Sequence, residues 1–192
     1  MENILTYEDY ISWDDKIRYE LVEGVRKIMA GVSEWHNRVS FRLSSIMDLF
    51  WDKKGRQKYF VFQSPFDVIL FPDEDDILKS KTTVQPDFGI CLKEKRDGRK
   101  IIGAPEFVIE IVSLNLDYDF RVKRDLYEKA GVLEYWVITP RENNITVYLL
   151  DIDKGVYKDP KNYELTMINN LKSAVIEGFE IDLSKIFDFS DI

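Results

Sequence analysis

The chain has 192 residues, 45% of them hydrophobic and 32% charged, which is the composition of an ordinary water-soluble globular protein with one substantial core. Thirty-five acidic residues against 27 basic ones give a net charge of −8, which argues against broad nonspecific adhesion to nucleic-acid phosphates. The first residues lack a signal-peptide pattern, and no apolar run approaches the roughly 20 residues that cross a bilayer, so we expect a cytoplasmic protein with no membrane partner.

The first elements are short. Thr6 and Asp9 have the spacing of a capping box and predict a short helix. Tyr19 to Val22 and Val25 to Met29 flank the dipeptide Glu23-Gly24, and this arrangement predicts a β-hairpin.

A longer helix is expected to start at Ser33 and to end before Gly55. Its apolar residues follow helical spacing and predict one buried face, formed by Val39, Leu43, Ile46, Met47 and Phe50. Residues 59–71 and 83–92 are rich in β-branched and aromatic side chains and are interrupted by prolines, so both stretches are expected to be strands.

The second half of the chain alternates strand, helix and strand. Phe107 to Val112 predicts a largely buried strand, Asp119 to Ala130 a helix that stops at Gly131, and Leu133 to Thr139 another strand. Such a unit favours a right-handed parallel crossover, and Ile145 to Leu150 then adds a hairpin strand. We therefore expect an α/β fold with a mixed sheet and helices packed on it, in one domain over residues 1–192, because no linker or repeat divides the sequence.

An acid pair is the most informative chemical feature. Asp87 follows Pro86, and Glu110 lies inside the apolar run of a predicted buried strand. An unpaired buried carboxylate costs several kcal/mol, so a compensating charge is expected, and a hard divalent cation between two carboxylates is one candidate. The ordinary alternatives are a turn-forming Asp87 after proline and a buried salt bridge from Glu110 to a lysine or arginine.

Other conspicuous residues have simpler interpretations. The acidic run from Asp73 to Asp76 is expected in a solvated loop. Cys91, the single cysteine, is expected to be a small buried hydrophobe. The aromatic residues Tyr127, Tyr135 and Trp136 fit core positions better than positions that stack on bases.

Several segments carry a family resemblance through their order and spacing: residues 19–24 (YELVEG), 34–36 (EWH), 85–87 (QPD), 103–113 (GAPEFVIEIVS), and the stretch from Lys123 through Tyr127 to residues 131–136 (GVLEYW). Together they resemble the bacterial putative restriction endonuclease family of the PD-(D/E)XK, restriction-endonuclease-like superfamily. The similarity covers roughly Tyr19 to Leu150 and is far more specific than the Pro-Asp step alone.

The resemblance implies a restriction-endonuclease-like core, in which a central mixed sheet is flanked by helices, together with an N-terminal hairpin. It also implies magnesium-dependent hydrolysis of phosphodiester bonds, expected in DNA, with Asp87 and Glu110 as metal ligands. Magnesium prefers oxygen ligands and keeps several waters, so two carboxylates suffice to anchor it, and Mn²⁺ is a possible substitute. An activated water would attack the phosphate, and no histidine base is required.

The third signature position departs from the superfamily pattern. Val112, two residues after Glu110, stands where the short motif would place lysine. Lys123 is our candidate for the missing positive charge, which would stabilise negative charge near the phosphate, and the resemblance places a lysine at this helix position. The alternative is an exposed Asp119–Lys123 pair worth a few tenths of a kcal/mol.

The hairpin and the next helix supply further candidates. Glu20 is expected as an additional acid that binds metal directly or through water. Glu23 competes for this role, although its place beside Gly24 is typical of a turn. His36 also matches the resemblance, and the alternative is a capping or hydrogen-bonding histidine at a helix start.

Two further functions compete with the nuclease. A catalytically inactive module could keep the nuclease fold and bind nucleic acid or a protein, which Val112 and the acidic charge favour. A glycosidase would need carboxylates about 5 to 10 Å apart and a sugar cleft, and nothing else in the sequence indicates one. A nuclease that cuts both strands of DNA works more easily with two active sites, so a homodimer is compatible with the nuclease hypothesis.

Overall fold

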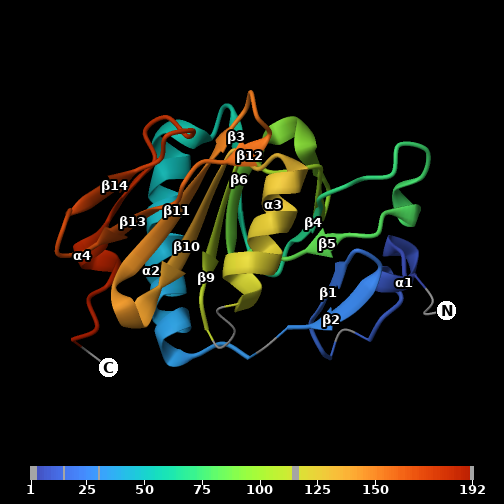
Figure 1. Ribbon diagram of the computed structural model, residues 1–192, viewed down its shortest axis with the longest axis horizontal. Helices are drawn as coiled ribbons and strands as arrows, with labels where there is room; N and C mark the ends of the chain where they lie inside the picture. Colours follow the sequence, from blue (N-terminus) through green and yellow to red (C-terminus); the bar gives the residue numbers. More distant parts are fainter. Residues whose placement is uncertain (1–3, 15, 30, 114–116, 191–192) are drawn as a thin grey trace.

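Two large β-sheets, a two-stranded C-terminal sheet and the packed helices form the fold of the computed structural model, which describes residues 4–14, 16–29, 31–113 and 117–190 (Figure 1). The smaller sheet has the strand order β2-β1-β5-β4-β8-β7. Its strands are β1 (Tyr19–Val22), β2 (Val25–Ile28), β4 (Asp67–Ile69), β5 (Thr83–Val84), β7 (Arg96–Asp97) and β8 (Lys100–Ile102).

The N-terminal part confirms the local predictions. Helix α1 (Tyr7–Ile11) begins after a capping box, in which the backbone N and Oγ1 of Thr6 donate to Asp9 Oδ2 over 2.8 and 3.0 Å. Strands β1 and β2 form the expected antiparallel hairpin. Its turn uses positive φ angles, 50° at Glu23 and 79° at Gly24.

The larger sheet has the strand order β12-β11-β10-β9-β6-β3, with β13 paired to β11. Its strands are β3 (Tyr59–Gln63), β6 (Phe88–Leu92), β9 (Phe107–Ile111), β10 (Glu134–Thr139), β11 (Asn144–Asp151), β12 (Val156–Tyr157) and β13 (Lys161–Glu164). Strands β9 and β10 are parallel, whereas the other paired strands of this sheet are antiparallel. The mixed sheet and the parallel crossover are thus confirmed.

Helices cover both faces of the larger sheet (Figure 1). Helix α2 (Glu34–Phe50) packs on the face that carries Phe107, Ile109 and Ile111 of β9. Helix α3 (Arg124–Ala130) packs on the opposite face, which carries Val108. Because side chains alternate along a strand, Glu110 lies on the α3 face.

Shorter elements complete the chain. They comprise the π-helical turns η1 (Trp51–Gly55) and η4 (Tyr118–Lys123), the 3-10 turns η2 (Ile77–Lys79), η3 (Lys93–Lys95) and η5 (Pro140–Glu142), and a C-terminal unit of β14 (Asn170–Lys172), β15 (Glu180–Asp182) and α4 (Leu183–Ile186). No helix among the described residues is long and apolar enough to cross a membrane.

The two proline-interrupted stretches each pass from one sheet to the other. Residues 59–71 form β3 in the larger sheet and β4 in the smaller one, and Pro65 lies between them. Residues 83–92 form β5 in the smaller sheet and β6 in the larger one, with Pro86 at the crossing. Asp87 therefore lies at the junction of the two sheets.

The simpler interpretations of conspicuous residues are confirmed. Asp73, Glu74 and Asp75 are exposed in a loop. Buried residues include Cys91 and three aromatic residues of the core, Tyr127, Tyr135 and Trp136. The predicted helix over residues 119–130 consists of η4 followed by α3, and it stops at Gly131, whose φ of 86° is left-handed.

Candidate active site

Strand register brings the acid pair together. Strands β6 and β9 are antiparallel with Phe88 opposite Ile109, so one further step of the ladder places Asp87 opposite Glu110. The backbone N of Asp87 donates to Glu110 Oε2 over 3.2 Å, and the backbone N of Ile111 donates to Asp87 Oδ2 over 2.7 Å. The main chain therefore fixes the separation of the two carboxylates.

Lys123 lies beside these acids, with 3% of its surface exposed. Its Nζ donates to Glu110 Oε1 over 3.0 Å and to Glu20 Oε1 over 2.5 Å. The alternative of an exposed Asp119–Lys123 pair is wrong, because the ammonium group is buried between two other acids. The ordinary alternative for Glu110, a buried salt bridge to lysine, is part of the same arrangement.

The positive charge of Lys123 lies on the same side of the sheet as Val112, the position at which the short motif would place a lysine. Val112 directly follows β9, points to the same side as Glu110 and packs into the apolar core beneath α3. Lys123 reaches this face from the end of η4, and Tyr127 of α3 donates from its hydroxyl to Glu110 Oε1 over 2.6 Å. Lys123 therefore brings its ammonium to Glu110 from the helical segment, whereas the lysine of the short motif would come from the strand itself.

Tyr118 is a site residue that sequence reasoning missed. Its hydroxyl donates to Glu20 Oε2 over 2.9 Å, so Tyr118 and Lys123 both contact one carboxylate. Residues five apart in an α-helix point about 140° away from each other. In the π turn Tyr118–Lys123 the hydrogen bonds run from i to i+5, which brings these two residues onto one side.

The hairpin acids differ in their placement. Glu20 is 2% exposed and also accepts a 2.8 Å hydrogen bond from the backbone N of Gln85, so its carboxylate holds three donors. Glu23 lies in the turn, its side chain is 63% exposed, and its nearest cation is Lys129 at 3.3 Å. The structure brings Glu20 into the acid cluster but leaves Glu23 at the rim of the cavity.

His36 lies at the start of α2, beside Asp87. Its backbone N donates to Ser33 Oγ over 3.2 Å, so that Ser33 is the residue that caps α2. Its ring Nε2 lies 3.1 Å from Asp87 Oδ2, within hydrogen-bond distance. Nδ1 is buried without a hydrogen-bond partner among the described residues.

Crowding of carboxylates in a buried place shifts their pKa values. Burial raises the pKa of Glu110 to about 7; Lys123 opposes this change, and Asp87 and Glu20 add to it. Burial and the neighbouring Glu110 raise the pKa of Asp119 to about 8. Desolvation disfavours the charged form of Lys123, but Glu110 and Glu20 outweigh it and hold its pKa well above the ordinary value.

Asp119 is a second residue whose place in the site sequence reasoning did not find. It lines the same cavity as Glu110, whereas its spacing in the sequence suggests only a surface pair with Lys123. Spacing along the helix could not distinguish a buried from an exposed position here.

The donor set fits a hard divalent cation. Asp87 Oδ1 has no hydrogen-bond partner within the described ranges, and Glu110 lies opposite it. These ranges hold no group of three or more His, Cys, Asp or Glu residues arranged to bind a metal. Two carboxylates would therefore leave most of the coordination shell to water, which suits Mg²⁺.

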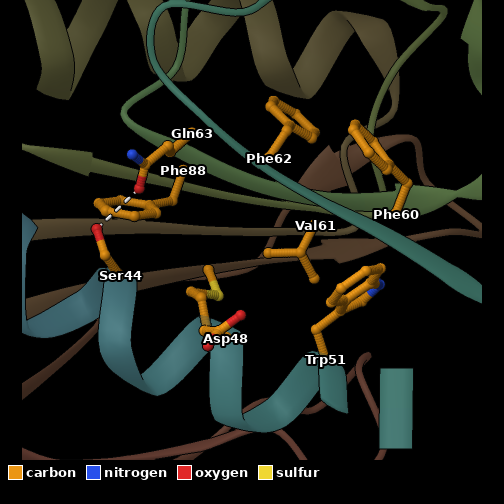
Figure 2. A pocket seen from close by; sticks show the side chains of 9 residues that line it. Ser44, Asp48, Trp51, Phe60, Val61, Phe62, Gln63 and Phe88 are labelled. Atoms are coloured by element: carbon orange, nitrogen blue, oxygen red, sulfur yellow. Dashed lines mark hydrogen bonds between the residues drawn. The ribbon is translucent and has the colours of Figure 1, made fainter. Parts of the chain in front are cut away.

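These acids lie in a cavity of about 620 Å³ that the hairpin closes on one side. Its lining includes Glu20, Asp87, Glu110, Asp119 and Lys123. A smaller pocket of about 290 Å³ lies between α2 and β3 (Figure 2). Trp51, Phe60, Val61 and Phe62 make it largely apolar, Ser44 Oγ donates to Gln63 Oε1 at one end over 2.8 Å, and it contains none of the predicted site residues.

Comparisons with known proteins show the fold and the family of the chain. The crystal structure of a putative nuclease belonging to DUF820 from Anabaena variabilis ATCC 29413 is similar over 95% of this chain and 97% of that chain, with a TM-score of 0.72 and 14% sequence identity. The shared fold confirms the expected nuclease-like architecture. No curated protein matches the chain. A family model described as Uma2, Putative restriction endonuclease, matches residues 7–184, so the chain belongs to this family.

Proposed function

We propose that the protein is a metal-dependent nuclease that hydrolyses phosphodiester bonds in DNA, with Mg²⁺ or Mn²⁺ as the cofactor. The observation that carries the proposal is the pair of opposed carboxylates, Asp87 and Glu110, with the buried Lys123 ammonium on the same cavity. Membership of a family of putative restriction endonucleases and the fold of a nuclease support a nuclease function.

Each side chain has a distinct role in this proposal. Asp87 and Glu110 would hold the cation. When bound, the cation supplies Lewis-acid stabilisation of the phosphoryl oxygens and lowers the pKa of water. Lys123 stabilises negative charge that develops on the phosphate, and its fixed position means that little reorganisation is needed.

The remaining residues orient these groups. Glu20 holds the Lys123 ammonium and would bind the cation directly or through water. Tyr127 fixes the Glu110 carboxylate, and His36 holds Asp87 from the α2 side. A homodimer would supply the second site that cleavage of both strands favours.

Cleavage assays on single-stranded, double-stranded and branched DNA test the proposal. Wild type is compared with Asp87→Asn, Glu110→Gln and Lys123→Met in Mg²⁺ or Mn²⁺, and with Asp153→Asn, an exposed acid outside the cavity, as the matched control. We expect at least a hundredfold loss of rate in the three site variants and none in the control. Circular dichroism of every variant separates loss of chemistry from loss of folding. Equal cleavage by folded site variants and wild type would contradict the proposal.

A non-catalytic module with the nuclease fold is the second candidate. Val112 in place of the motif lysine and the net charge of −8 favour it. Calorimetric titration with Mn²⁺ separates the two. Binding that Asp87→Asn abolishes supports the nuclease, whereas no binding at millimolar Mn²⁺ supports a module that binds nucleic acid or protein without cleaving.

A further inference from the structure

Two cations on the N-terminal hairpin face the same cavity as the acid pair. Arg18 and Lys27 both line this cavity. Lys27 lies opposite Glu20 in the β1–β2 register, and side chains directly opposite each other share one face of a sheet. Arg18 precedes Glu20 by two residues and so projects to the same side, and the hairpin pairing extends to it because Met29 N donates to Arg18 O over 3.0 Å.

Uncharged acceptors, and no carboxylate, hold the Arg18 guanidinium in place among the described residues. Its Nε and Nη2 donate to Gln85 Oε1 over 3.3 and 2.7 Å, and Nη2 also donates to Ser64 Oγ. These acceptors are uncharged, so the guanidinium keeps its full positive charge. A planar guanidinium that is already immobilised loses little entropy when it binds a phosphate.

Gln85 is itself locked in one orientation. Its Nε2 donates to Asp67 Oδ1 over 2.9 Å and to the Tyr10 hydroxyl over 3.0 Å, which directs Oε1 toward Arg18. The same residue precedes Pro86 and Asp87. The position of the Arg18 guanidinium is therefore tied to the segment that carries the acid pair.

Lys27 lacks the partner that its position would ordinarily give it. An acid directly across a hairpin usually pairs with the lysine opposite. Here the Glu20 carboxylate is turned to Lys123, Tyr118 and the backbone of Gln85. Lys27 is exposed and makes no ion pair with another described residue, so its ammonium is available to a ligand.

We propose that Arg18 and Lys27 bind the phosphates that flank the scissile one in a nucleic-acid strand, and that Gln85 is the positioning residue for Arg18. This inference rests on the proposed nuclease function. The chain has a net charge of −8 and therefore no broad excess of basic residues to attract phosphate. Under this proposal, two cations beside the site provide that attraction instead.

Oligonucleotide binding tests the two cations. Fluorescence anisotropy with a labelled single-stranded DNA, in Ca²⁺ as a non-cleaving substitute for Mg²⁺, is measured at several salt concentrations. Arg18→Gln and Lys27→Gln are compared with Arg141→Gln and Lys158→Gln, which make the same charge changes at exposed positions outside the cavity. We expect each hairpin variant to weaken binding about three- to tenfold and to lower the slope of log K against log salt by about 0.7.

A double-mutant cycle tests Gln85. Gln85→Ala should weaken oligonucleotide binding in the wild-type background and have almost no further effect in Arg18→Gln, because both changes disturb the same contact. A purely structural role would instead lower thermal stability in both backgrounds and leave the salt slope unchanged. Additive losses of affinity would contradict a positioning role.

The outcomes distinguish this inference from the proposed function. If wild type cleaves but the hairpin variants bind like their controls, the inference is overturned and the nuclease stands. If wild type neither cleaves nor binds Mn²⁺, while Arg18→Gln and Lys27→Gln still lose binding, the nuclease proposal fails and the hairpin assignment is supported. A wild type that binds no oligonucleotide in Ca²⁺ overturns the inference.

Discussion

Lys123 shows how much of the site depends on single side chains. Its ammonium contacts Glu20 from the hairpin and Glu110 from β9, and thereby links the two sheets across the cavity. Replacing one partner of a buried ion pair ordinarily costs about 3–5 kcal/mol, because the other charge is left uncompensated. The stability and the chemistry of the site therefore rest on the same cation.

Asp119 carries a prediction about pH. Its pKa rises from 3.8 to about 8 in the folded chain, mainly through burial. Between these values the unfolded chain loses the proton and the folded chain keeps it, so this carboxyl stabilises the fold fully below pH 3.8 and progressively less up to about pH 8. Asp119→Asn should therefore gain thermal stability over wild type as pH rises through this window.

Melting temperatures measured from pH 4 to 9 in a chelating buffer check this expectation. A difference of roughly 2–4 °C is expected for each kcal/mol in a chain of this size. Glu110 has a raised pKa for the same reason, so some of the wild-type slope remains in the variant. A difference between the two proteins that does not change with pH would contradict the prediction.

Sequence reasoning found some of these residues and missed others for physical reasons. Asp87 and Glu110 stand out because a carboxylate beside or within an apolar strand needs compensation. Tyr118 could not be found, because its position depends on a π turn that changes which residues share a helix face. Helical periodicity assumes an α-helix and assigns Tyr118 to another face than Lys123, and it cannot tell whether the face shared by Asp119 and Lys123 points into a cavity or into solvent.

At the scale of elements, β-propensity predicted which segments form strands but not which strands pair with each other. The stretches 59–71 and 83–92 are indeed extended, yet each divides at a proline and contributes to both sheets. β-propensity reflects how a side chain fits a pleated surface and carries little information about which strand lies alongside. Pairing between distant strands had to come from the structure.

Strand β6 offers a test at this scale. A Cβ on Gly89 would lie 2.2 Å from the ring of Phe62, which is the residue paired with it on β3. Gly89→Ala should therefore overpack the contact and cost about 1–3 kcal/mol in the free energy of unfolding. Urea denaturation measures the loss, and Gly31→Ala, where nothing lies within 4 Å of the added Cβ, is the matched control. Equal stability of both variants would show that β3 shifts freely away from β6.

At the scale of the whole molecule, Glu134 joins the C-terminal unit to the larger sheet. This residue of β10 is 1% exposed. Its Oε2 accepts from Ser173 Oγ over 2.6 Å and from the backbone N of Ala174 and Val175 over 2.9 and 3.1 Å. Oε1 accepts from Trp136 Nε1 over 2.8 Å. One buried carboxylate thus holds the loop before β15 against β10.

Glu134→Gln should weaken this connection without altering the site. The amide replaces an acceptor oxygen with a donor that faces other donors, and an unsatisfied buried group costs about 1–3 kcal/mol or more. We expect a lower urea midpoint together with unchanged Mn²⁺ affinity by calorimetry, because Glu134 does not line the cavity. A parallel loss of Mn²⁺ affinity would contradict this separation.

The crossing at Pro86 has a consequence for how the site could be shortened or transplanted. Asp87 lies directly before β6 of the larger sheet and Glu110 lies in β9 of that sheet, whereas Glu20 belongs to the smaller one. A fragment that began after the hairpin would keep the acid pair and Lys123 but would lose the carboxylate that holds the ammonium from the other side. The β1–β2 hairpin is thus as much a part of the site as the segments that carry Asp87 and Glu110.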